Sequence, residues 1–251
     1  MSVQDLEKLA QRLAKDGPYK HESTPRRVRG LFNGAYAFDT IRAHYVWEIP
    51  NYPQFYIPIE DFTSDAKLEI AKEPVPKTDG GASLAVLTVG DKSTVKVISF
   101  KKGPLAGLVK TIFGAIDQWF EEETPIYIHP KDPYKRISIL PSTRRVRVAL
   151  DGVTLAETSA SIFLLETSLR PRYYIPPTSV NWHLLSKSDT ESGCPYKGTA
   201  NYYNAEVNGK VYRDIVWWYQ HPTMESAPIA GYLCFYNERV DVHIDGIKED
   251  R

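Results

Sequence analysis

Two side chains in the last quarter of the chain have the types and the spacing needed for covalent or acid–base chemistry. Cys194 and Lys197 are three residues apart in a segment that reads Gly-Cys-Pro-Tyr-Lys-Gly over residues 193–198. An ammonium group beside a thiol favours the thiolate, which is the nucleophilic form of cysteine. A lysine in an aromatic-lined pocket loses its proton readily and then acts as a base or an amine nucleophile. The spacing therefore predicts Cys194 as a nucleophile or thiol donor, with Lys197 as its electrostatic partner or a base.

Further residues in the same part of the chain are candidates for binding a ligand. They are Arg147, Glu166, Tyr174, Trp218 and Tyr236. On alternating strands one set of aromatic rings packs in the core, and the opposite set can line a pocket for a flat or cationic ligand. Glu166 lies among apolar residues, so its carboxylate needs a partner, for which Arg147 and Lys197 are the candidates. A structural ion pair and a ligand contact both stay open for this glutamate.

These residues belong to a module that occurs twice in the chain. Residues 27–62 align without a gap with residues 145–180, at an offset of 118 and with ten identities. Such self-similarity indicates an internal repeat. Each copy opens with a hairpin signal, Asn33-Gly34 in the first and Asp151-Gly152 in the second, because a type I′ turn needs positive φ at both central residues. The pattern predicts a mainly β protein with two tandem domains of antiparallel sheets.

The two copies differ after their shared opening. The part of the first copy equivalent to the Cys194–Gly198 segment is residues 74–81, which keep the turn-forming proline and glycine but lack the cysteine. If the segment served only to turn the chain, proline and glycine would suffice in both copies. This difference favours chemistry at Cys194 and Lys197, in the second copy only. The alternative, a buried structural cysteine beside a lysine whose stem packs on apolar neighbours, stays open.

The remaining pattern predicts helices at two places and a boundary between the domains. Apolar residues at helical spacing indicate an N-terminal helix from residue 3 to 13, with Ser2 as its cap and Gly17 as its end. A similar spacing over residues 105–116 predicts a second helix, inserted in the first copy. We expect later strands at residues 200–207, 211–219, 231–236 and 240–244. The expected domains are an N-terminal helix over residues 1–20, a degenerate first copy over 21–140 and the second copy over 141–251.

The composition argues against several classes of function. Lys+Arg 31 balances Asp+Glu 31, so the protein has no global charge that would attract nucleic acid. No apolar run approaches the roughly 20 residues of a membrane-spanning helix, and the N-terminus lacks a secretory pattern. We therefore expect a cytoplasmic protein. Two cysteines are too few for a disulfide scaffold, and they show no spacing with the histidines that would indicate a metal site.

Several segments of the second copy carry a family resemblance. They are residues 172–176 (Arg-Tyr-Tyr-Ile-Pro), 194–200 (Cys-Pro-Tyr-Lys-Gly-Thr-Ala), 218–219 (Trp-Tyr) and 234–241 (Cys-Phe-Tyr-Asn-Glu-Arg-Val-Asp), with Asp245-Gly246 near the end. Together they resemble the signature of the domain of unknown function 427 family, which carries a nucleotidyltransferase-like label. Residues 129–136 resemble the link found in its two-domain members, so the resemblance covers about residues 26–246.

The resemblance implies a β-tent-like fold, in which two antiparallel sheets lean together in each domain. It implies no established activity. The nucleotidyltransferase label finds no support in the residues, because the sequence has neither a Gly-Ser followed by paired aspartates nor a P-loop. The first copy also departs from the Cys-Pro-Tyr-Lys-Gly pattern.

The sequence thus predicts a small-molecule-binding protein whose site lies in the second domain. One interpretation is an enzyme of specialised metabolism that uses the Cys194/Lys197 pair. The other is a non-catalytic module that binds a ligand or a peptide among its aromatic residues. The residues leave open the identity of the ligand, any cofactor and the oligomeric state.

Overall fold

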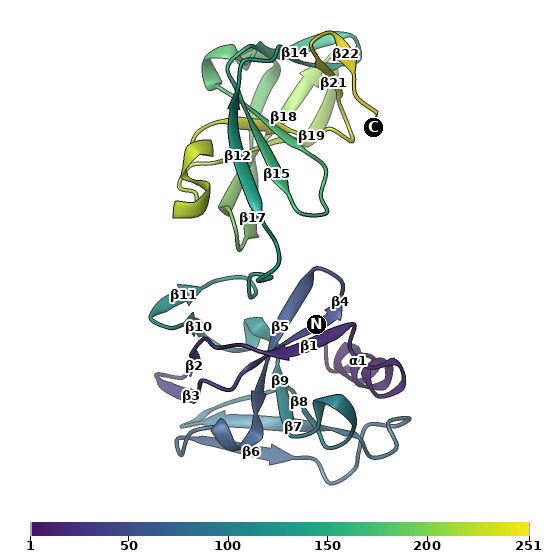
Figure 1. The fold of residues 1–251 in the computed structure, drawn as a ribbon, viewed down its shortest axis with the longest axis vertical. Helices are drawn as coiled ribbons and strands as arrows, with labels where there is room; N and C mark the ends of the chain where they lie inside the picture. The colour runs from purple at the N-terminus through teal and green to yellow at the C-terminus, as the bar shows by residue number, and fades with distance from the viewer. Residues whose placement is uncertain (1, 251) are drawn as a thin grey trace. The chain divides into compact units, whose positions relative to one another are not determined.

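The computed structural model describes residues 2–250 and contains two compact units, which divide between Asp132 and Pro133 (Figure 1). Residue 140, near which the sequence placed the boundary, lies inside a strand of the second unit. Within residues 2–250, each unit consists of a seven-stranded and a four-stranded sheet, both antiparallel. The mainly β, tandem fold predicted from the sequence is confirmed.

The strands of the first unit occupy residues 20–126. Its seven-stranded sheet has the order β1 (Lys20–Ser23), β4 (His44–Ile49), β5 (Tyr52–Pro58), β9 (Leu108–Thr111), β8 (Lys92–Phe100), β7 (Ala82–Val89) and β6 (Ala66–Ile70). Its four-stranded sheet has the order β11 (Thr124–Ile126), β10 (Gln118–Glu121), β2 (Val28–Phe32) and β3 (Ala35–Thr40).

The second unit repeats this topology strand for strand. Its seven-stranded sheet has the order β12 (Ile137–Ser142), β15 (Ser161–Glu166), β16 (Arg172–Ile175), β20 (Leu233–Phe235), β19 (Lys210–Tyr219), β18 (Gly198–Val207) and β17 (Leu185–Cys194). Its four-stranded sheet has the order β14 (Val153–Thr158), β13 (Val146–Leu150), β21 (Asp241–Ile244) and β22 (Ile247–Lys248). The later strands expected from the sequence are therefore confirmed.

The hairpins that open each copy explain why the repeat was visible in the sequence. Asn33 and Gly34 have φ of 51° and 80°, and Asp151 and Gly152 have φ of 46° and 80°. Positive φ at both central residues is the type I′ geometry, which matches the twist of the flanking strands. These turns pair β2 with β3 and β13 with β14.

The predicted N-terminal helix is confirmed as α1 (Val3–Asp16). The Ser2 side chain accepts a hydrogen bond from the backbone N–H of Asp5, and the chain leaves the helix at Gly17. One face of α1 is buried and packs with Val46, Tyr56 and other residues on one face of the seven-stranded sheet. None of the helices within residues 2–250 has the length and apolar character needed to cross a membrane.

The second predicted helix is wrong. Residues 105–116 contain strand β9, which lies between the 3-10 turns η2 (Gly103–Leu105) and η3 (Phe113–Ala115). Strand β9 pairs with β5 on one side and β8 on the other, and all four of its residues are buried. A strand covered on both faces has apolar residues at consecutive positions, and a short run of this kind also fits helical spacing. Gly103, with φ of 74°, begins η2, and Gly107, with φ of 82°, separates η2 from the strand.

A pair of core residues shows how the two copies fill the same space differently. Gly30 pairs with Phe38 in the first unit, and Val148 pairs with Ala156 at the same positions of the second. A Cβ atom on Gly30 would lie 2.1 Å from the Phe38 ring. The first copy therefore places its bulk on β3, whereas the second places it on β13.

We expect Gly30→Val to lower the free energy of unfolding by about 1–3 kcal/mol, because the added methyl groups overlap a buried ring. Adding Phe38→Ala, which recreates the valine–alanine pair of the second unit, should recover part of that loss. Urea unfolding of the single and double variants measures the coupling. Equal or greater destabilisation in the double variant would contradict this account of the core.

Candidate functional site

The predicted Cys194–Lys197 segment forms the turn between β17 and β18. Cys194 ends β17 and is paired with Gly198, which begins β18. Gly198 has φ of 101°, and a Cβ atom there would lie 3.2 Å from the backbone oxygen of His221. Glycine is needed at this position because the backbone is left-handed and a second loop approaches it closely.

That second loop holds the backbone of the turn. It contains the 3-10 helix η6 (Met224–Ile229) and precedes β20. The backbone N–H of Thr223 donates to the Lys197 oxygen at 3.1 Å, and the Ser226 hydroxyl donates to the Tyr196 oxygen at 3.1 Å. Ser226 is fully buried, so these bonds anchor the turn from within.

Lys197 does not extend into solvent. The residue is 8% exposed, and its Nζ lies 2.5 Å from Oε2 of Glu166, on β15. A second lysine, Lys135, approaches Oε1 of the same carboxylate at 3.4 Å. The expected partnership between Glu166 and Lys197 is therefore present in the structure, and a buried carboxylate of this kind requires such a cation. Sequence reasoning missed Lys135, because this residue lies 31 positions before Glu166, at the start of the second unit and outside the aligned repeat.

Cys194 ends β17 and is partly buried, whereas Cys234 on β20 is fully buried; both are free cysteines. Both cysteines lie close enough to the phenols of Tyr174 and Tyr219 that an ionised thiol would raise the pKa of either phenol. Burial raises the pKa of Cys234 far above its ordinary value, which keeps this thiol protonated. Of the two, only the Cys194 side chain is accessible to a reagent from solvent.

Aromatic residues cover the sheet behind the turn. We call the side of the second seven-stranded sheet that contains Tyr174, Tyr202, Trp217, Tyr219 and Cys234 the aromatic face. Trp217 Nε1 donates to the Tyr174 hydroxyl at 3.2 Å, and the Trp217 ring lies 4.5 Å from that of Tyr236. Tyr174 is fully buried, so it supports this layer from below, whereas Tyr236 is partly exposed.

Trp218 and Arg147 lie apart from the aromatic face. Trp218 packs against the core between the two sheets, where its ring is 6.1 Å from that of Tyr203. Successive residues of a strand point to opposite sides, so Trp217 takes the place expected for Trp218. Arg147 lies on β13 of the four-stranded sheet, and its Nε donates to the Thr154 hydroxyl at 3.0 Å. It is Lys197, and not Arg147, that pairs with Glu166.

The first unit also has a largely buried carboxylate on this face, but the lysine that neutralises it lies on β9. Glu48, the equivalent of Glu166, forms an ion pair with Lys110 and accepts a hydrogen bond from the Tyr56 hydroxyl at 3.0 Å. Lys110 pairs with Ile98 in the ladder, as Cys234 pairs with Trp217 in the second unit. Lys110 therefore occupies the position of Cys234. Each unit has one buried glutamate on this face, and the neutralising lysine differs.

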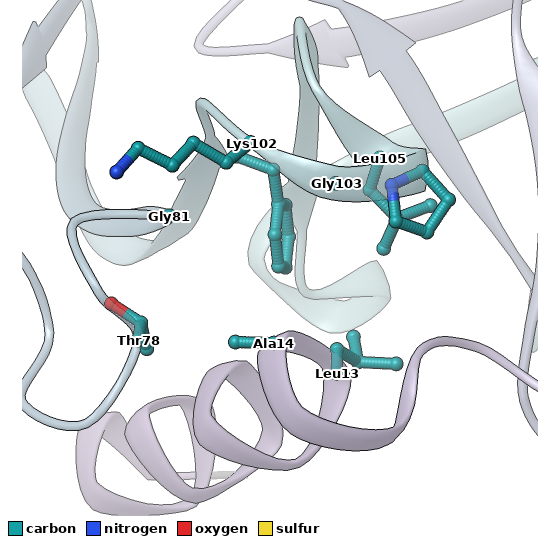
Figure 2. A pocket seen from close by; sticks show the side chains of 9 residues that line it. Leu13, Ala14, Thr78, Gly81, Lys102, Gly103 and Leu105 are labelled. Carbon is teal, nitrogen blue, oxygen red and sulfur yellow. The ribbon is translucent and has the colours of Figure 1, made fainter.

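The turn equivalent to the Cys194–Gly198 segment is closed in the first unit. Figure 2 shows Thr78 and Gly81 of this turn above Leu13 and Ala14 of α1, with the Lys102 side chain reaching over the turn. A cavity of about 70 Å³ remains between them. The Lys102 ammonium donates to the backbone oxygen of Asp79 at 2.6 Å. Helix α1 thus packs on the face of the first sheet whose counterpart in the second unit packs with Ile229 of η6.

Residues 2–250 contain no cluster of three or more histidine, cysteine, aspartate or glutamate side chains arranged to hold a metal ion. The site is thus described by a thiol, a buried lysine–glutamate pair and aromatic rings.

The fold and the site define a class of protein: a tandem repeat of an antiparallel β domain with a distinct polar centre in its second copy. A family model described as a domain of unknown function (DUF427), and labelled NTP_transf_9, matches residues 20–121 and 138–246. The chain belongs to this family and carries two copies of its domain. No curated protein matches the chain.

Proposed function

We propose that the second unit is a β-tent-like domain that binds a small organic molecule beside the Cys194–Gly198 turn. The observation that carries the proposal is a partly exposed cysteine, Cys194, in the same β17–β18 turn as Lys197, whose ammonium forms a buried ion pair with Glu166. The partly exposed ring of Tyr236 supplies an apolar contact at the margin of the aromatic face. We place the protein in the cytoplasm, where the thiol stays reduced.

Within this proposal Lys197 has an electrostatic role. To act as an amine nucleophile, its ammonium would have to lose its proton and its ion pair with the carboxylate 2.5 Å away. The buried positive charge instead favours an anionic part of a ligand at the turn. A partly exposed thiol in such surroundings can attack an electrophilic ligand or bind one without reaction.

Alkylation of the native protein tests the reactivity of this thiol. We expect iodoacetamide to modify Cys194 and to leave Cys234 unmodified, because the second thiol is sealed in the sheet. Lys197→Met should slow the reaction of Cys194, since it removes a positive charge from the turn where negative charge develops on sulfur. Lys187→Met, on the exposed part of β17, is the matched control and should react at the wild-type rate. Mass spectrometry of the labelled peptides gives both rates.

Ligand binding is tested with a thermal-shift screen of metabolites, because a ligand that prefers the native state raises Tm. A true ligand protects Cys194 from alkylation. Cys194→Ser then separates the two modes: a binding module keeps its affinity, whereas a cysteine enzyme loses turnover. Rapid alkylation of Cys234 in the folded protein, or hits that protect neither cysteine, would contradict the proposed site.

A further inference from the structure

Arg29 in the first unit is enclosed by three side chains. Its guanidinium lies 5.1 Å from the ring of Tyr36 and 5.3 Å from the ring of Phe120. Its Nη2 donates to a carboxylate oxygen of Glu123 at 2.6 Å. Arg29 is 6% exposed, and its charge is neutralised within the domain by Glu123, whose own side chain is 81% exposed.

The second unit places an arginine at the same position with smaller neighbours. Arg147 is the equivalent of Arg29 in the repeat and pairs with His243 on β21, as Arg29 pairs with Phe120 on β10. Thr154 takes the place of Tyr36 at the repeat offset of 118. The two aromatic rings beside Arg29 are thus replaced by smaller side chains, Thr154 and His243, beside Arg147.

The turn that supplies Glu123 is also conserved in shape but not in charge. In the first unit the backbone N–H of Glu122 donates to the Arg27 oxygen at 2.8 Å, and in the second that of Asp245 donates to the Arg145 oxygen at 2.8 Å. Glu122 and Asp245 also share left-handed φ values, 51° and 53°. The residue that follows is Glu123 in the first unit and Gly246 in the second. The carboxylate that neutralises Arg29 therefore has no counterpart beside Arg147.

A pocket of about 340 Å³ lies where these side chains are missing. It is lined by Arg145, Arg147, His243, Asp245 and Gly246. A Cβ atom on Gly246 would meet nothing within 4 Å, which agrees with open space there. The Nδ1 atom of His243 is buried and has no hydrogen-bond partner within residues 2–250. Buried polar atoms are nearly always hydrogen-bonded, to protein or to water, so this ring nitrogen is a further polar group of the pocket that the described residues leave unpaired.

The carboxylates near the pocket are already engaged. Asp245 accepts hydrogen bonds from Arg144 Nε at 2.6 Å and from the backbone N–H of Arg145 at 3.0 Å. Glu157 pairs with the Arg145 side chain. Within residues 2–250, Arg147 forms no ion pair, and its described side-chain bond is to the neutral Thr154 hydroxyl. The Arg147 guanidinium therefore has N–H donors that pair with no carboxylate within residues 133–250.

We propose that this pocket binds the carboxylate group of a small molecule, in the place that Glu123 occupies in the first unit. A guanidinium offers two parallel N–H donors to a carboxylate, and this pairing is strong where water is partly excluded. We assign a carboxylate ligand because a carboxylate is the group that the first copy itself provides. The pocket lies on the four-stranded sheet, so it is separate from the site proposed at Cys194.

Titration of the full chain with succinate tests the pocket, with the Arg147 Nε–H and His243 ring signals followed by NMR. We expect saturable shifts of these signals in the wild type. Arg147→Gln should weaken binding at least about tenfold, because it removes the charge-assisted pair. Gly246→Glu should do the same, since it supplies an internal carboxylate. Gly246→Ala, which imposes similar backbone strain without a charge, is the matched control and should keep binding within about threefold.

Two comparisons decide between ligand classes. Succinamide, which has no charge, should give no saturable shift, and inorganic phosphate should bind more weakly than succinate. Tighter binding of phosphate would overturn the assignment to a carboxylate. The proposed carboxylate binding would be overturned if the wild type showed no saturation. It would also be overturned if the wild type, Arg147→Gln and Gly246→Glu bound succinate with equal affinity. Cys194→Ser should bind succinate as the wild type does, so failure here is distinguishable from failure of the thiol site.

Discussion

Lys110→Met should lower the free energy of unfolding of the first unit by about 3–5 kcal/mol, because it leaves the Glu48 carboxylate buried without its cation. Lys110 is 2% exposed and lies between β5 and β8, so water cannot replace its ammonium. The hydrogen bond from Tyr56 remains but carries no charge. Unfolding of the full chain in urea, followed by hydrogen exchange of β8 and β9 amides, reports on this unit separately from the other.

The controls separate an unpaired charge from lost packing. Adding Glu48→Gln to Lys110→Met removes the isolated carboxylate and should recover part of the stability. Lys92→Met breaks an exposed pair with Asp117 and should cost less than about 1 kcal/mol. In the second unit, Lys197→Met should cost less than Lys110→Met, because Lys135 remains 3.4 Å from Glu166. Equal losses for Lys110→Met and Lys92→Met would show that the buried pair does not stabilise the fold.

The second large effect is a steep loss of stability in alkali. Burial raises the pKa of Tyr56, Tyr174 and Tyr219 well above the ordinary value of tyrosine. Their phenols ionise more readily in the unfolded chain than in the folded one, so the folded state is favoured below about pH 10 and loses this advantage as the pH rises further. These three groups alone contribute about 4 kcal/mol per pH unit to the slope above that point, and Tyr45, Tyr173 and Tyr236, whose pKa values burial also raises, steepen it further.

Urea unfolding at pH 10.5 and 11.5 measures the slope. Lys110 contributes in the opposite direction, because burial lowers its pKa, but its contribution ends near the ordinary lysine pKa of about 10.4. Tyr219→Phe should reduce the slope by about 1.4 kcal/mol per pH unit. Tyr127→Phe is the control, since that residue is 75% exposed. A slope that does not change in Tyr219→Phe would show that this phenol is not protected by the fold.

The two predictions concern the same face of the two sheets, and the sequence described that face only in part. The shared glutamates, Glu48 and Glu166, stood out because each lies among apolar strand residues, and Lys197 was one of two partners named for Glu166. Lys110 was hidden in a segment whose apolar spacing suggested a helix. Its role became visible only when β9 was placed between β5 and β8. Strand alternation likewise decided that Trp217 lies on the aromatic face and that Trp218 packs against the core between the sheets.

What the sequence determined by itself was the duplication, the hairpins and helix α1, because each of these depends on residues close together in the chain. A type I′ turn needs two residues of positive φ, and a capped amphipathic helix needs a regular spacing of apolar side chains. The tertiary structure decided which cation neutralises each buried glutamate, since the partners are 31 and 62 residues apart. It also opened the pocket at Arg147. Both outcomes depend on which strands become neighbours, and local patterns do not contain that information.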